Sequence, residues 1–171
     1  MKSSGIVRLS GWALIVGVLG FAFGLVVESL APAVRLRASG LEEFGQWSIF
    51  VSLGLIGIGL LGARIRYGDQ VGSAGRTLLL VGAIGGFAAF TDRLEPLYQL
   101  IPNWWVVVWA AVFVLFACTM GFGVVAMRRR PLQSWNWLPI FSGAFPVALL
   151  VGAVLGVDFS SQDAVFAAAA L

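Results

Sequence analysis

The side chains that could carry out chemistry in this sequence are few, and their types exclude whole classes of site. The 171 residues include no histidine and a single cysteine, Cys118. Haem centres with histidine ligands, histidine-rich zinc sites and Ser-His or Cys-His nucleophile pairs therefore cannot form within these residues. One cysteine also excludes an internal disulfide and a cysteine-ligated cluster. Because Cys118 lies in an apolar run, we expect it to behave as a small hydrophobic side chain.

Carboxylates stand at the ends of long apolar stretches and not inside them. Glu28, Asp92 and Asp158 each lie where an uncharged stretch ends. Ionisable groups in the middle of a membrane span mark proton relays, ion paths and substrate sites. Their absence from the central positions argues against a pump, an ion-coupled transporter and an intramembrane protease. The sequence therefore predicts no catalytic residue, no metal ligand and no enzymatic activity.

The elements that carry these residues must be membrane helices, because the composition excludes a water-soluble fold. Hydrophobic residues make up 60% of the chain, charged residues 11%, and 22 residues are glycine. A typical soluble domain has about 25% charged residues, and a small soluble fold cannot hide this much apolar surface from water. We therefore predict an all-α polytopic membrane protein, and we exclude nucleic-acid-binding modules and disordered chains.

Uncharged stretches of spanning length predict a bundle of five transmembrane helices in one domain, residues 1–171. A helix needs about 20 residues to cross the hydrocarbon core, and the predicted spans are 9–27, 44–63, 72–91, 102–127 and 137–157. The third span is the weakest, because only 15 residues separate Arg76 from Asp92. It crosses if its helix begins near Gly72 and Arg76 extends to the headgroups. A re-entrant or interfacial segment is the alternative.

The distribution of positive charge predicts that the N-terminus is inside and the C-terminus outside. With five crossings, eight of the 11 basic residues lie on the cytoplasmic side, where loops collect lysine and arginine. Without the third crossing the split becomes six to five. The arginines on the inner side also predict contacts with anionic lipid or with an acidic partner. They are Arg64, Arg66, Arg76, Arg128, Arg129 and Arg130.

Small residues recur at helical spacing and predict close helix packing. Four of them follow every fourth position in the fifth span, and pairs occur in the first and third spans. Small side chains on one stripe let another helix approach closely, which is what favours association in lipid. The helix that packs on such a stripe could belong to the chain's own bundle or to another subunit, and the pattern is consistent with both. The residues are Gly20, Gly24, Gly82, Gly86, Ala144, Ala148, Gly152 and Gly156.

Tryptophans near the starts of three spans predict anchors at the membrane–water interface. The indole ring is apolar and its N–H favours a polar partner, so the side chain suits the headgroup region. The predicted anchors are Trp47, Trp104, Trp105, Trp135 and Trp137.

Two functions fit a chain of predicted membrane helices that has no ionisable residue in the central positions of its spans. The first is an accessory or structural subunit of a larger membrane protein complex, with no chemistry of its own. The alternative is a carrier or permease for an uncharged or lipid-like solute, which needs no buried charge. We expect no cofactor bound by this chain's own ligands, although an apolar cofactor or lipid could lie between it and a partner. The expected partners are the lipid bilayer and other membrane subunits, with no nucleic acid, and the expected location is a cell membrane, that of a prokaryote.

Overall fold

The structure is a computed structural model that describes residues 3–30, 39–132 and 136–154, and all regular elements in these ranges are helical. The long helices are α1 (Ser3–Leu30), α2 (Ser39–Phe90), α4 (Trp104–Arg129) and α5 (Leu138–Val154). A short 3-10 turn, η1 (Thr91–Arg93), and the six-residue helix α3 (Glu95–Leu100) join α2 to α4. The all-α prediction therefore holds for the described residues.

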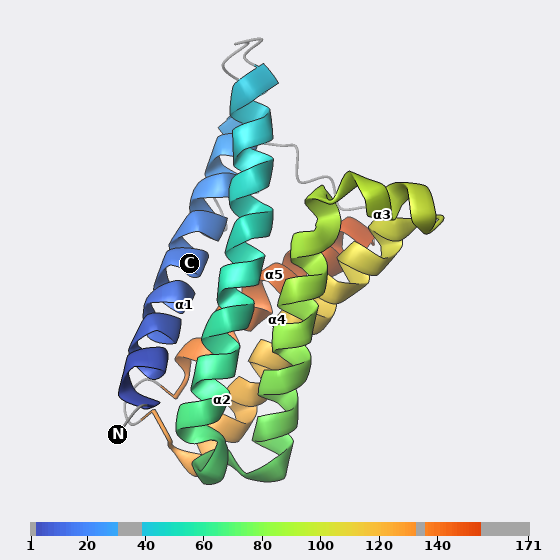
Figure 1. Ribbon diagram of the computed structural model, residues 1–171. Helices are drawn as coiled ribbons and strands as arrows, with labels where there is room; N and C mark the ends of the chain where they lie inside the picture. Colours follow the sequence, from blue (N-terminus) through green and yellow to red (C-terminus); the bar gives the residue numbers. More distant parts are fainter. Residues whose placement is uncertain (1–2, 31–38, 133–135, 155–171) are drawn as a thin grey trace.

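Helix α2 is two helical arms joined at Gly72. This residue has φ 71° and ψ −171°, a backbone conformation that is open to glycine and strained for residues with a Cβ atom. The first arm (39–71) and the second arm (73–90) run in opposite directions from this turn (Figure 1). The backbone therefore leaves the helical path at the residue near which the sequence predicts the third span to begin.

Among the described residues, three helices are long and apolar enough to cross a membrane, and the predicted count of five is not supported by this measure. The three apolar segments are Gly5–Val27, Glu43–Phe90 and Trp104–Arg129. Two features explain why three apolar segments are found where the sequence predicts five spans. The segment in α2 has 48 residues and contains both arms, and the described part of α5 has only 17 residues.

The helical rods alternate in direction and pack in chain order. Helix α1, the two arms of α2, α4 and α5 run successively up and down the bundle (Figure 1). Helix α1 packs on α2, α2 on α4, and α4 on α5. The core lies where these contacts meet, and Leu53, Leu79 and Leu115 are at most 1% exposed there. The rings of Phe21 and Phe116, 5.4 Å apart, also bring α1 against α4.

The outward surface is apolar along most of its length. Helix α1 is the least covered of the three long apolar segments, with 17% of its span buried against 44% for α2 and 39% for α4. Trp12, Leu19 and Phe23 are all more than half exposed along α1. Such a surface is unfavourable in water and favourable in lipid, because the hydrophobic effect acts only on area facing water.

The two arms of α2 touch backbone to backbone at Gly57 and Gly86. A Cβ atom placed on Gly86 would lie 2.7 Å from the carbonyl oxygen of Leu53 and 3.1 Å from the Cα atom of Gly57. Neither neighbour can move without moving the first arm. A side chain at this crossing would therefore force the arms apart.

We predict that Gly86→Ala lowers the stability of the folded protein. Overpacking at a filled contact costs about 1–3 kcal/mol, which exceeds the gain of at most about 1 kcal/mol in helix propensity when glycine becomes alanine. Thermal melting in detergent, followed by circular dichroism, measures the change.

Gly11→Ala is the matched control, because nothing lies within 4 Å of a Cβ atom at Gly11 on α1. This variant makes the same chemical change on an open helix face and should melt at or above the temperature of the unmodified protein. Equal effects of the two substitutions would contradict close packing of the arms.

Candidate functional site

Several arginines gather at one end of the bundle, which we call the arginine end: Arg8, Arg64, Arg66, Arg76, Arg128, Arg129 and Arg130. Three contacts bring this end together. Ser10 of α1 lies against Gly62 in the first arm of α2, and the side chain of Arg76 packs on Gly68 across the turn. A guanidinium nitrogen of Arg129 lies 3.9 Å from the position of a Cβ atom on Gly72. The start of α1, the turn of α2 and the end of α4 therefore meet at the same end (Figure 1).

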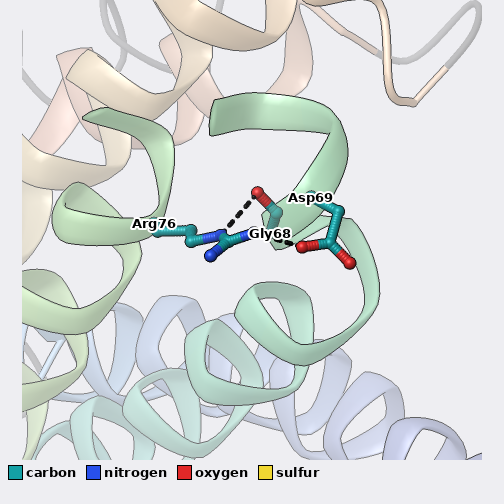
Figure 2. Close-up of polar contacts among 3 residues, drawn as sticks. All are labelled: Gly68, Asp69 and Arg76. Atoms are coloured by element: carbon teal, nitrogen blue, oxygen red, sulfur yellow. Dashed lines mark hydrogen bonds and ion pairs between the residues drawn. The ribbon is translucent and has the colours of Figure 1, made fainter. Parts of the chain in front are cut away.

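Arg76 is already engaged by the chain itself. Its Nε–H donates a hydrogen bond of 3.0 Å to the carbonyl oxygen of Gly68, and its terminal nitrogen pairs with the carboxylate of Asp69. Figure 2 shows these contacts across the turn. The side chains of Arg76 and Asp69 are 48% and 96% exposed, so the pair lies at the surface of the turn and not in the interior.

The other arginines predicted to contact anionic lipid or an acidic partner have surroundings that differ from those of Arg76. Arg66 donates a hydrogen bond of 3.2 Å to the hydroxyl oxygen of Tyr67, and its guanidinium carbon lies 5.5 Å from the centre of the same ring. Arg64, Arg128, Arg129 and Arg130 are exposed. Within the described ranges, the ion pair at Asp69 is made with Arg76 and not with these four.

The three consecutive arginines also complete the end of α4. Arg130 adopts the left-handed conformation with φ 55°, and its backbone N–H donates a hydrogen bond of 2.7 Å to Ala126. Arg128 and Arg129 lie in the last turn, where positive charge interacts favourably with the helix dipole and with the unpaired carbonyl groups. The run of charge therefore ends the helix and concentrates guanidinium groups at one place.

The predicted packing glycines of the first span face the chain's own α2. A Cβ atom on Gly20 would lie 2.5 Å from the hydroxyl oxygen of Ser52, and the hydroxyl group of Ser48 donates a hydrogen bond of 2.9 Å to the carbonyl oxygen of Gly20. A Cβ atom on Gly24 would lie 2.9 Å from the carbonyl oxygen of Gly45. The interface thus combines bare backbone with small hydroxyl side chains, as membrane helix pairs commonly do.

The predicted pair in the third span also faces the chain itself. Gly86 meets the first arm, and a Cβ atom on Gly82 would lie 3.2 Å from the Cβ atom of Cys118 on α4. The second arm is therefore held between the first arm and α4. The half-buried thiol of Cys118 fills this contact.

The stripe predicted for the fifth span is only partly described. Ala144 is half-buried; the side chains of Ala148 and Gly152, and all of Gly156, lie outside the described residues. The close contact that the structure shows is made by the neighbouring Gly143, where a Cβ atom would lie 2.6 Å from the carbonyl oxygen of Phe116.

Sequence reasoning missed several glycines that also face a neighbouring helix. It considered spacings of four residues and overlooked the second span, where four of the five glycines lie between positions 54 and 62. Two of those positions face α1 and two face the second arm. The dense glycine pattern from 54 to 62 was the available signal. The missed residues are Gly17, Gly54, Gly57, Gly59, Gly62, Gly85, Gly123 and Gly143.

The predicted tryptophan anchors do not behave alike. Trp47, Trp105 and Trp137 are 41%, 56% and 44% exposed, whereas Trp135 lies outside the described residues. Trp104 is half-buried, and its indole N–H is buried with no acceptor among the described residues. Trp104 is therefore less exposed than Trp47, Trp105 and Trp137, and the anchor role of these tryptophans stays a prediction.

The described residues contain no group of three or more histidine, cysteine, aspartate or glutamate side chains placed to hold a metal ion. No family model, no curated protein and no solved structure matches the chain. The geometry of the chain itself is therefore the basis for a functional proposal.

Proposed function

We propose that this protein is an integral membrane subunit that acts through its outer surfaces and carries out no chemistry of its own. The observation that carries this proposal is the close packing of the described helices at the centre of the bundle. Helices touch at backbone level, and the centre is filled by apolar side chains. A protein of this kind can hold partners or lipids in place, but it offers little for a reaction or for a passage through its middle.

The filled interior is made by small and large apolar residues together. Leu53 and Leu79 are each 1% exposed, while Ala83 and Leu115 are fully buried. Each comes from a different turn of α2 or from α4, so they fill the space between the arms and α4. A carrier for an uncharged solute needs room between its helices, and the contact between Gly57 and Gly86 favours the subunit over the carrier.

We further propose that the chain crosses the membrane five times, with its N-terminus and the arginine end inside. Each arm of α2 crosses once. The second arm, of about 18 residues, has a length of about 27 Å at about 1.5 Å per residue, which is close to the about 30 Å of the hydrocarbon core. Helix α5 makes the last crossing. The arginine end then faces the cytoplasm, in agreement with the positive-inside rule.

Reporter fusions at five positions test this topology. We predict that fusions after residues 40, 95 and 165 report the outer side, and that fusions after residues 70 and 132 report the inner side. Fusions at 70 and 95 that report the same side would show that the second arm does not cross. That result would contradict the five-span arrangement.

The exposed face of α1 is the surface on which we expect the partner subunit. This helix packs mainly on α2 and leaves Trp12, Val16, Leu19 and Phe23 more than half exposed on one stripe. Truncation of large side chains at such a surface removes packing area from an interface without opening a cavity in the bundle.

Native mass spectrometry of the tagged chain, released from its own membrane in mild detergent, tests the subunit proposal. We predict that a second polypeptide accompanies the chain in a fixed ratio. The variant Trp12→Ala/Leu19→Ala should lose this partner while its melting temperature stays unchanged.

Trp109→Ala/Phe113→Ala is the matched control, because these α4 side chains are 52% and 44% exposed on a different face. This variant should keep the partner. A chain that is released alone, or as copies of itself only, would contradict the subunit proposal and favour the carrier.

A further inference from the structure

On the five-span arrangement proposed above, the arginine end lies at the level of the lipid headgroups. In the last turns of α4, Val124 and Met127 are 45% and 52% exposed. Apolar side chains this exposed are more favourable in hydrocarbon than in water, and the next three residues are all arginine. The change from apolar surface to charge therefore occurs within one turn of helix. Long arginine side chains at such a boundary place their charged groups among the headgroups.

We propose that Arg128, Arg129 and Arg130 form a binding site for the phosphate group of an anionic phospholipid, beside the turn at Gly72. A guanidinium group binds phosphate through two parallel hydrogen bonds and keeps its charge at every physiological pH. Arg129 extends toward the turn, and Gly72 carries no side chain to occupy that space. The lipid's acyl chains pack along the exposed Met127 and Val124, which separates a phospholipid from free phosphate as the ligand.

Arg76 is excluded from this site although it belongs to the same end. Its guanidinium group pairs with the carboxylate of Asp69, and its Nε–H donates a hydrogen bond to the carbonyl oxygen of Gly68 (Figure 2). Among the described residues, the carboxylate of Asp69 forms no such pair with the arginines of α4. The site therefore depends on particular arginines and not on the total positive charge of the arginine end.

Titration of the purified full chain with lipid, read by native mass spectrometry, tests the proposal. The probes are phosphatidylglycerol and phosphatidylcholine, which share a phosphate group and differ in net charge. We expect the unmodified chain to prefer phosphatidylglycerol. Each guanidinium–headgroup contact is worth a factor of about five in binding, so Arg128→Gln/Arg129→Gln should weaken phosphatidylglycerol binding about 25-fold. Detergent solution removes any effect of these changes on membrane orientation.

Asp69→Asn/Arg76→Gln is the matched control, because it removes one pair of opposite charges from the turn and leaves the net charge unchanged. We expect its affinity for phosphatidylglycerol to stay within about twofold of the unmodified chain. Arg128→Lys/Arg129→Lys keeps the charge but loses the paired hydrogen bonds, so it should bind phosphatidylglycerol more tightly than the glutamine variant and less tightly than the unmodified chain. Retained binding also shows that substitution at the end of α4 leaves a folded protein. Melting curves of all variants accompany the titration.

Three results would overturn the proposal. The first is equal binding of the two lipids to the unmodified chain. The second is a loss of binding in Asp69→Asn/Arg76→Gln as large as in the α4 variant, because Arg76 would then be the contact. The third is displacement of the lipid by excess inorganic phosphate, which would identify free phosphate as the ligand.

Discussion

The structure depends on contacts in which the bare backbone of one helix lies against a carbonyl group of the next. Lipid surrounds apolar side chains as favourably as protein does, so helices in a membrane associate mainly through close packing and weak polar contacts. Gly17 approaches Ser52, Gly86 approaches Leu53, Gly85 approaches Ala111 and Gly143 approaches Phe116, each with a Cβ position 2.6–2.9 Å from a carbonyl oxygen. These four contacts join all five helical rods in chain order. Such approaches also suit weak hydrogen bonds from Cα–H groups to carbonyl oxygens.

Composition and charge distribution predict the fold class of this protein well, because few folds are compatible with so little charge and such long apolar stretches. The absence of charge over long stretches and its concentration in short clusters are enough to predict apolar helices separated by turns. Gly72 could be predicted as the start of a helix, since Arg76 leaves too little apolar length after it. The sharp turn itself could not, because nothing in a glycine-rich sequence distinguishes one glycine with a positive φ from 21 others.

The candidate sites were less predictable, since they depend on which residues face which helix. Spacing alone places Gly20 and Gly24 on one stripe, but only the fold shows that α2 covers it. Gly143 of α5 lies against Phe116 of α4, and the pattern of small residues, which selects the neighbouring Ala144, does not determine the rotation of α5 that brings Gly143 there. Likewise, six arginines look equivalent in sequence, and only the turn brings Asp69 to Arg76 and leaves the arginines of α4 unpaired with it.

The molecule therefore has an apolar interior and two kinds of surface, the apolar sides of the helices and the arginine end. On the function proposed above, the interior provides stability, the long apolar sides of the helices meet lipid or neighbouring subunits, and the arginine end meets the headgroups. The central claim is that nothing passes through the middle. Labelling of a cysteine at position 83 tests this claim most directly, because Ala83 is fully buried between the arms and α4. In detergent solution and a Cys118→Ser background, a charged maleimide should leave Ala83→Cys unlabelled in the folded protein and should label Ser73→Cys, at the exposed turn. Labelling at position 83 as fast as at position 73 would show a water-filled path and would contradict the account.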